Sequence, residues 1–453
     1  MKAVVLAAGN GERASPYSLT RPKAMFPVAN KPIICYIISY LKEAGIEEFV
    51  IVLGKLGDRI VNYLGNGEKL GVKISYVTQP TPNGTSKALA IAKSELKEDG
   101  ELIVVYGDIL TTKRTFIELI ESFRRSGAMA TVAVKEGDAT HNFGTEIREN
   151  KMSSIVWRPR ESNLRTYGII AMKSKFLSYV ERNPGIMLKV PVGMMPPLEG
   201  ELFQSINDAI ENGESITFFK VKDFIVDVDY PWSLIEANVS MLKHMSNELT
   251  SSQIAPSAKI SQSAQISGNI VVGDDSRIGE NVYIEGPVWI GKNSIIDRGS
   301  IILGPSVIGD NTVVSNYSLV QGVIGNEVRV ENAAEVFGII FDGVYIVHYS
   351  EIAGIVGERT DIGAATVCGT LRFDDEKTIV EVKGKKLIGE NVAFIGDYCR
   401  TGVNAILMPG VRVGPYSIVG PGVILYEDLE PYKIVLAKQE LVKKDWGPNK
   451  YGW

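Results

Sequence analysis

An aliphatic residue recurs at every sixth position through much of the second half of the chain. The residues are Ile254, Ile260, Ile266, Val272, Ile278, Ile284, Ile290, Ile296, Ile302, Ile308, Val314 and Val320. An α-helix repeats every 3.6 residues and a lone strand every two, so neither selects a strict period of six. The side chains must therefore stack along one axis, with Gly and small polar residues at the corners. The pattern predicts a parallel β-helix over residues 253–430, with three six-residue rungs per coil.

The six-residue count slips after Val320 and resumes in the segments IGEN, IGDY, VRVG and SIVG. We therefore expect a loop to interrupt the coils between about residues 372 and 386. The tail, residues 431–453, has no periodic signal and stays unassigned.

The first half of the chain alternates short β-rich runs with helix-like stretches. Strands are expected over Lys2–Leu6, Phe49–Leu53, Ile74–Val77 and Leu102–Tyr106, and a helix over Ile33–Ala44. This βαβ rhythm predicts a mostly parallel sheet covered by helices, with ligands beyond the carboxyl ends of its strands. We assign residues 1–232 to this α/β domain and residues 233–252 to a linker helix, within a helical stretch from Trp232 to Asn247.

Length and composition narrow the class of protein. A chain of 453 residues is too long for one core, and 45% hydrophobic with 22% charged residues is typical of a soluble globular protein. A net charge of −5 and the lack of a long basic run argue against a nucleic-acid partner. Three scattered cysteines favour a reducing compartment, and the amino terminus lacks a signal-peptide pattern. We expect a cytoplasmic protein with no membrane partner.

Glycines follow the first predicted strand, in the segment LAAGNGER. Gly9 and Gly11 allow backbone N–H groups to approach phosphate oxygens without interference from a Cβ atom. A tight turn of purely geometric use is the alternative. Arg13 and Lys23 bracket the turn and would neutralise a triphosphate and its pyrophosphate leaving group, unless they are solvated surface charges.

The whole segment LAAGNGERASPYSLTRPKAMFPVANKPI resembles the signature of sugar-1-phosphate nucleotidylyltransferases. Together with the solenoid, it resembles the bifunctional N-acetylglucosamine-1-phosphate uridylyltransferase and glucosamine-1-phosphate acetyltransferase family, in its archaeal form. The resemblance implies a Rossmann-like nucleotidyltransferase domain and a left-handed β-helix. It also implies Mg²⁺-dependent transfer of a nucleotidyl group from UTP or dTTP to a sugar 1-phosphate, as in UDP-N-acetylglucosamine biosynthesis.

The resemblance assigns roles residue by residue. Arg13, Lys23 and Asp108 are the implied catalytic residues, and Asp108 and Asp227 are the implied ligands of Mg²⁺, a cation that prefers carboxylate oxygens. Gln79 is expected to pair with a pyrimidine edge. The implied nucleotide-binding residues are Leu6, Ala7, Ala8, Gly9, Gly11, Arg13, Gln79, Gly84 and Thr85.

Several positions depart from the signature. Glu12 stands where Ser or Thr is expected, and Asp229 replaces the glycine after the second metal aspartate. Trp157 and Arg158 occupy positions where the signature has Glu and Lys. Thr166, Tyr167 and Gly168 occupy positions where it has Asn, Ala and Gly. The nucleotide half of the site therefore looks preserved and the sugar half altered. Gly144 and Thr166 are the expected sugar-binding residues.

A second activity is implied for the solenoid. His348 in IVHYSEIAG resembles the base of an acetyl-CoA-dependent amino-sugar-1-phosphate acetyltransferase, and Arg400–Gly414 resembles a coenzyme A wall. Glu351 and Thr370 differ from the family pattern, so whether this site is active stays open. The resemblance also implies a homotrimer assembled through the β-helix.

Three interpretations of the chain stay open. The chain is either an enzyme or a degenerate relative that binds a nucleotide sugar as a regulatory or assembly subunit, which Glu12, Trp157 and Thr370 support. Alternatively, only acetyl transfer survives.

Overall fold

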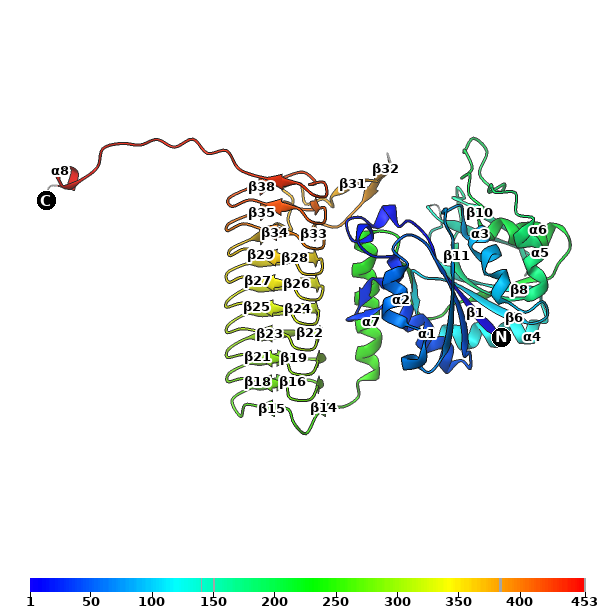
Figure 1. Cartoon of the computed structure of the whole chain (residues 1–453), viewed down its shortest axis with the longest axis horizontal. Helices are drawn as coiled ribbons and strands as arrows, with labels where there is room; N and C mark the ends of the chain where they lie inside the picture. The colour runs from blue at the N-terminus through cyan, green and yellow to red at the C-terminus, as the bar shows by residue number, and fades with distance from the viewer. Residues whose placement is uncertain (140, 150, 383–384, 452–453) are drawn as a thin grey trace.

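The computed structural model describes residues 1–139, 141–149, 151–382 and 385–451. An amino-terminal α/β domain lies beside a tall solenoid, and one long helix, α7 (Pro231–Glu248), runs between them along the solenoid (Figure 1). Its Pro231 suits the first helical position, where no backbone N–H is needed.

The amino-terminal domain is built on one large sheet. Its strands are β1 (Lys2–Ala7), β4 (Glu48–Leu53), β5 (Lys73–Thr78), β6 (Glu101–Tyr106), β8 (Ala130–Glu136), β9 (Phe143–Arg148), β10 (Lys151–Trp157), β11 (Leu164–Lys173) and β12 (Ile216–Lys220). The order β5-β4-β1-β6 is parallel throughout, which confirms the predicted Rossmann-like arrangement. Because helices cover this parallel core, the central strands are buried on both faces, and Ala3, Val4 and Val5 are fully buried.

Helices connect these strands. They are α1 (Ile33–Glu43), α2 (Asp58–Leu64), α3 (Thr85–Ala92), α4 (Lys113–Ser126), α5 (Leu177–Glu181) and α6 (Leu202–Glu211). The 3₁₀ turns are η1 (Glu12–Ala14), η2 (Tyr17–Leu19), η3 (Lys23–Met25), η4 (Glu68–Leu70), η5 (Lys93–Glu95) and η6 (Ser174–Phe176). Two small two-stranded sheets complete the domain: β2 (Pro27–Val28) with β3 (Lys31–Pro32), and β7 (Ile109–Thr111) with β13 (Ile225–Asp227).

The second half is the expected left-handed parallel β-helix. Its strands are β14 (Gln253–Ile254), β15 (Lys259–Ile260), β16 (Gln265–Ser267), β17 (Ile270–Val272), β18 (Arg277–Ile278), β19 (Tyr283–Glu285), β20 (Val288–Ile290), β21 (Ile295–Ile296), β22 (Ile301–Ile308), β23 (Val313–Val314), β24 (Leu319–Ile324), β25 (Arg329–Val330), β26 (Glu335–Ile340), β27 (Tyr345–Ile346), β28 (Glu351–Val356), β29 (Asp361–Ile362), β30 (Val367–Cys368), β33 (Ala393–Ile395), β34 (Arg400–Thr401), β35 (Ile406–Leu407), β36 (Arg412–Val413), β37 (Ile418–Val419), β38 (Ile424–Leu425) and β39 (Ile434–Val435). Ile278 pairs with Ile296, so the first coils repeat every third rung, as the sequence predicts.

The slip after Val320 has a structural cause. Val320 pairs with Val336 and then Val336 with Ile352, so each of these coils is 16 residues long, because one rung of six is shortened to four. Gly322 and Gly338 lie at the shortened face with φ of +128° and +147°. A Cβ on Gly338 would collide with the carbonyl oxygen of the glycine in the next coil. Only glycine suits this close backbone approach.

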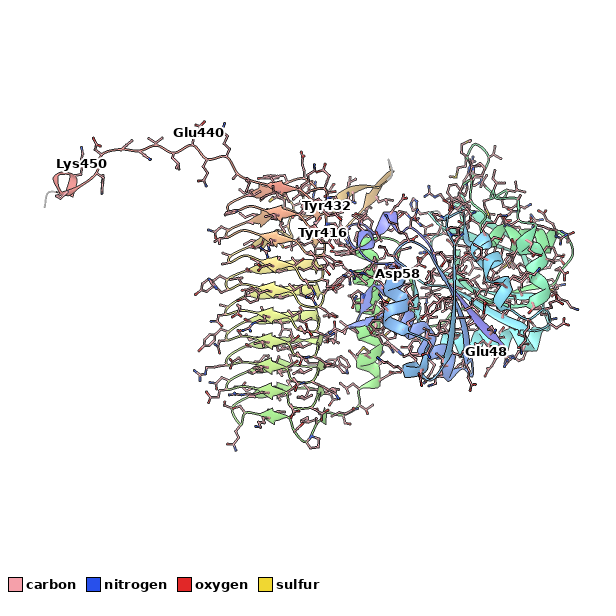
Figure 2. The ribbon with its side chains drawn as sticks, in the orientation of Figure 1. Glu48, Asp58, Tyr416, Tyr432, Glu440 and Lys450 are labelled. Carbon is pink, nitrogen blue, oxygen red and sulfur yellow. The ribbon has the colours of Figure 1, made fainter. Side chains whose placement is uncertain are left out.

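The expected interruption is an antiparallel hairpin, β31 (Ile379–Val382) with β32 (Lys385–Ile388), which falls in the predicted interval and extends two residues beyond it. The last rung, β39, pairs with β37 and lies past the predicted solenoid end at 430. The following tail reaches away from the solenoid to α8 (Pro448–Tyr451), and Glu440 and Lys450 mark its course (Figure 2). None of the helices in the described part of the chain combines the length and the hydropathy that a membrane span requires.

The shortened coils also form the contact between the two halves. Beside each inward residue, a second apolar residue points outward, and Val323, Ile339, Ile355 and Phe394 stack in one column. These four side chains are buried in the core of the amino-terminal domain. This outward column of the solenoid therefore belongs to the apolar core of the α/β domain, whereas the inward-facing residues of the coils form a core of their own.

Candidate active site

The glycine loop follows the carboxyl end of β1, so Leu6, Ala7 and Ala8 form its buried floor. Gly11 adopts φ +63°, and a Cβ there would come within 3.2 Å of the Lys23 side chain. Glycine at this position therefore lets Lys23 pass beneath the loop. Gly9 is exposed, and a Cβ there would meet nothing within 4 Å.

The two predicted metal aspartates are brought together by a small antiparallel pairing. Asp108 lies between β6 and β7, and Asp227 is the last residue of β13, opposite Ile109 of β7. The backbone N–H of Val228 also donates to the Asp108 carbonyl, at 3.0 Å. Residues far apart in the chain therefore converge at the carboxyl end of the central sheet, as expected for such folds.

Two cations of the glycine loop face this carboxylate group. Lys23 pairs with Asp108 and, at 3.0 Å, with Asp229, whose same oxygen also accepts from Arg13 at 2.9 Å. Arg165 of β11 pairs with Asp227 at 3.0 Å. The structure thus brings Arg13, Lys23, Asp108 and Asp227 into one cluster.

Burial and the neighbouring charges shift the pKa values of Asp227 and Asp229 in opposite directions. Burial, with the nearby charges of Asp229 and Asp108, raises the pKa of Asp227 to about 7. Burial would also raise the pKa of Asp229, but the charges of Lys23 and Arg13 outweigh it and hold that pKa below its usual value. Despite burial, the same carboxylates raise the pKa of Lys23. Lys23 therefore remains charged at neutral pH.

The donor set fits a hard divalent cation. Asp108, Asp227 and Asp229 each offer one carboxylate oxygen, and these oxygens lie within 4.8 Å of one another. Oxygen ligands around a compact centre suit Mg²⁺, which keeps waters and substrate phosphates in its remaining positions. Asp229 adds a third carboxylate to the two that the sequence signature predicts.

The predicted base-recognition segment lies next to this cluster. Gln79 is buried, and its amide nitrogen donates to Asn83 at 2.8 Å and to the Gly84 carbonyl at 3.3 Å. Gly84 has φ +106° and backs closely on Gly200. Thr85 begins α3 and donates to Glu201 at 2.9 Å. Burial and these contacts therefore hold the Gln79 side chain in place within its loop.

Glu201 was not anticipated from the sequence. Burial raises its pKa to about 7, although the hydrogen bond from Thr85 acts in the opposite direction. The only sequence signal for Glu201 is that it precedes an amphipathic helix, α6.

The predicted sugar half is arranged differently from the nucleotide half. Thr166 is buried in β11 and shares a hydrogen bond of 2.6 Å with the Thr145 hydroxyl. Its neighbour Arg165 points instead at Asp227 and pairs across the sheet with Gly144. Gly144 itself is closely approached by the side chains of Pro159 and Ser162. Arg165 was not predicted from the sequence as a site residue. Side chains alternate along a strand, so residues 165 and 166 lie on opposite faces, and this alternation was the available signal.

Arg158 occupies a constrained position beside the cluster. Its φ is +50°, its guanidinium lies 4.7 Å from the Trp157 ring centroid, and its Nε has no hydrogen-bond partner among the described residues. Burial, with the nearby charge of Arg13, lowers the pKa of Arg158. Glu12, the other departure in this region, is exposed in η1.

His348 lies elsewhere, on the turn between β27 and β28 of the solenoid. The imidazole is exposed and packs edge-to-face on Tyr349, with ring centroids 5.0 Å apart. Glu351 begins the next strand and Thr370 is exposed beyond β30. The structure therefore separates the predicted acetyl-transfer residue from the nucleotidyl cluster.

Two family models match the two halves of the chain. Residues 2–179 match the nucleotidyl transferase family, and residues 287–322 and 393–426 match the bacterial transferase hexapeptide family. A glucose-1-phosphate thymidylyltransferase-like structure from Bacillus anthracis covers 53% of this chain and 94% of its own, at 25% identity and a TM-score of 0.47.

Full-length relatives carry both halves. The bifunctional protein GlmU of Methanococcus maripaludis strain C7 is 33% identical over 451 residues, and that of strain S2 is 31% identical over 453; each alignment covers 98% of both chains. A bifunctional sugar-1-phosphate nucleotidylyltransferase/acetyltransferase of Sulfurisphaera tokodaii is 29% identical, over 95% of this chain and 98% of its own. With this likeness along its whole length, the chain belongs to the archaeal family of bifunctional GlmU-type sugar-1-phosphate nucleotidylyltransferase/acetyltransferases.

Proposed function

We propose that the amino-terminal domain transfers a uridylyl or thymidylyl group from UTP or dTTP to a sugar 1-phosphate, releasing pyrophosphate. The observation that carries this proposal is the convergence of Arg13 and Lys23 with Asp108 and Asp227 at the end of the central sheet. Cations for a triphosphate and oxygen ligands for a divalent metal are the two requirements of nucleotidyl transfer.

In this mechanism an oxygen of the sugar 1-phosphate attacks the α-phosphorus, and the bond from the α-phosphorus to the pyrophosphate oxygen breaks. Arg13 and the backbone of the glycine loop hold the triphosphate, and Lys23 faces the reacting phosphates. Asp108, Asp227 and Asp229 would hold Mg²⁺, which neutralises charge on the phosphates when it is bound. Catalysis is then mainly positioning and charge neutralisation.

The residues of the sugar half differ from those of the family signature, so the sugar 1-phosphate is bound by other side chains than in the family pattern. Arg158 stands beside Arg13, where a second cation suits an acceptor phosphate next to the triphosphate. Trp157 stands where the family signature has a glutamate that would bind hydroxyl groups, and its ring lies under the Arg158 guanidinium. The sugar is therefore to be identified by experiment over a wide panel of 1-phosphates.

The test is pyrophosphate release with Mg²⁺ and either UTP or dTTP, against glucose, N-acetylglucosamine and galactose 1-phosphates. We expect turnover with at least one pair, and an Asp108→Asn variant should lose it. Nucleotide binding without turnover across the panel would favour the regulatory alternative instead.

The whole-length likeness to bifunctional relatives supports acetyl transfer as a second activity, with acetyl-CoA as co-substrate. His348 is the proposed base and Arg400–Gly414 the proposed coenzyme A wall, in a homotrimer assembled through the solenoid. His348→Ala should abolish acetylation of glucosamine 1-phosphate while leaving pyrophosphate release intact. Sedimentation that shows a monomer at micromolar concentration would contradict the trimer.

A further inference from the structure

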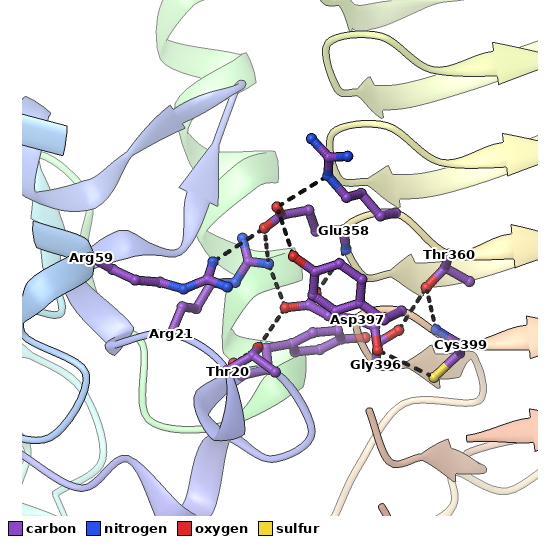
Figure 3. Close-up of polar contacts among 11 residues, drawn as sticks. Thr20, Arg21, Arg59, Glu358, Thr360, Gly396, Asp397 and Cys399 are labelled. Atoms are coloured by element: carbon purple, nitrogen blue, oxygen red, sulfur yellow. Dashed lines mark hydrogen bonds and ion pairs between the residues drawn. The ribbon is translucent and has the colours of Figure 1, made fainter. Parts of the chain in front are cut away.

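The loop that carries Arg13 and Lys23 is held on its far side by the solenoid. Asp397, in the turn between β33 and β34, is fully buried. Its Oδ2 atom accepts hydrogen bonds from the Thr20 hydroxyl and the Arg21 guanidinium. Figure 3 shows Thr20 and Arg21 reaching from the amino-terminal domain to this carboxylate.

Further contacts reinforce the same junction. Arg21 also pairs with Glu358 at 2.8 Å, and Glu358 accepts from Arg59 of α2 at 3.3 Å. The Arg21 guanidinium lies 4.9 Å from the Phe341 ring centroid. Tyr17, fully buried, donates its hydroxyl proton to the Ile355 carbonyl at 2.8 Å. The loop is therefore fixed to the solenoid at three of its residues.

These anchors lie between the two cations of the nucleotidyl cluster. Tyr17 and Thr20 follow Arg13 in the chain, and Arg21 is separated from Lys23 only by Pro22, whose ring restricts the backbone. A shift of Arg21 must therefore move Lys23 relative to its carboxylate partners.

Solenoid geometry alone does not require a carboxylate at position 397. The Oδ1 atom of Asp397 caps the backbone N–H of Glu358 at 2.7 Å. Asp342 caps the backbone N–H of Asn326 in the same way two coils earlier, also at 2.7 Å, and the amide oxygen of Asn326 caps Asp310 at 2.8 Å. An asparagine side chain can therefore accept the backbone hydrogen bond that links one coil to the next, which we call the coil ladder. Among the residues that the structure describes, the hydrogen bonds to the other carboxylate oxygen, Oδ2, come from Thr20 and Arg21 of the other domain.

We propose that Asp397 is a positioning residue for nucleotidyl transfer, so that the solenoid is a working part of that active site. The inference rests on the proposed function of the amino-terminal domain. The carboxylate holds Thr20 and Arg21, and through them it places Lys23 at the reacting phosphates. A buried ion pair of this kind is strongly disrupted when one partner loses its charge.

The test compares two asparagine variants of the full chain. Asp397→Asn keeps an oxygen for the ladder but presents an uncharged amide to Arg21, and we expect kcat/KM for the nucleotide to fall about tenfold to a hundredfold. Asp342→Asn is the matched control, because Asp342 is exposed and has the same ladder role. It should retain wild-type kinetics.

A second variant tests the anchor from the other domain. Thr20→Val removes the hydroxyl that donates to Asp397 and leaves the sequence of the solenoid unchanged. If Asp397→Asn fails to fold, the kinetics of Thr20→Val test the proposal. Both anchor variants should speed hydrogen exchange in residues 13–25, with acetyl transfer unchanged.

Two results would overturn the proposal: kinetics within about twofold of wild type in both anchor variants, or unchanged exchange in residues 13–25. If the wild-type protein shows no nucleotidyl transfer, the proposed function fails, and the exchange measurement still decides whether the anchor exists.

Discussion

Asp229 shows how one residue alters the charge balance of the phosphate loop. Related signatures carry glycine at this position, whereas here a single carboxylate oxygen binds both Arg13 and Lys23. The two cations that would meet a triphosphate are thus paired inside the protein. Binding a nucleotide requires these pairs to break, and a bound divalent cation would take up the released carboxylate.

We therefore predict that Asp229→Gly binds UTP more tightly than wild type in the absence of metal, by about tenfold, since one repulsive charge near the phosphates is removed. Calorimetric titration in chelator measures this affinity. Asp229→Asn, which keeps the shape and loses the charge, should behave in the same way. Equal metal-free affinities in all three proteins would contradict this account of the phosphate loop.

The raised pKa of Glu201 predicts that the stability of the folded protein decreases as pH rises. Burial raises its pKa from the usual 4.5 to about 7, so the folded protein keeps a proton that the unfolded chain releases between these values. Stability is therefore lost as pH rises through this window. Below pH 4.5 both states are protonated and the effect vanishes.

Glu201→Gln carries no charge and should escape this loss. We expect it to melt about 2–4 °C above wild type at pH 8 and at the same temperature near pH 4.5. Thermal unfolding at both pH values measures the difference, with the exposed Glu161→Gln as control. A constant difference across the pH range would show that Glu201 does not titrate in this window.

At the scale of the element, the shortened coils depend on a column of glycines. Gly322, Gly338 and Gly354 all have positive φ, and each lies against the backbone of the next coil. On the shortened face a second apolar residue per coil points outward, toward the α/β domain. That face is the one that contacts α7 and the phosphate loop.

Gly338→Ala should destabilise the solenoid by about 1–3 kcal/mol from backbone strain, with the collision added. Gly422→Ala is a useful comparison, because Gly422 has φ +66° but open space around its missing Cβ. Chemical denaturation should show the larger loss for Gly338→Ala. Equal losses would mean that close coil packing contributes nothing.

At the scale of the whole molecule, one apolar core crosses the boundary between the two halves. The outward column of Ile339 and its neighbours is buried with residues of the sheet domain, and Trp232 of α7 contacts Phe394 with ring centroids 6.5 Å apart. The two halves therefore hold a fixed relation, which the phosphate-loop anchor requires.

Ile339→Asp should open this contact, because burial of an isoleucine contributes about 1.5–3 kcal/mol and a buried charge opposes it. We expect small-angle scattering to give a larger radius of gyration for this variant. Ile295→Asp, at an exposed apolar position of the solenoid, should leave the radius unchanged. An unchanged radius in Ile339→Asp would show that other contacts suffice to hold the halves together.

Much of the nucleotidyl cluster could be expected from sequence, because Arg13 and Lys23 belong to one contiguous glycine-loop segment and Asp108 follows a predicted strand. Asp227 was implied by the family resemblance, and all four side chains meet in space. Glu201 lacks such a pattern, since its role depends on a partner more than a hundred residues away in the chain.

The sequence by itself determined the two kinds of domain, because periods of six and of alternating βα units are local properties of the chain. It also located the phosphate loop, because that motif is contiguous. Only the tertiary structure decided that Asp397 meets Thr20 and Arg21, that Asp229 pairs with both loop cations, and that the shortened face of the solenoid covers the α/β domain. Contacts of this kind depend on how distant segments pack, and no local pattern of residues encodes that packing.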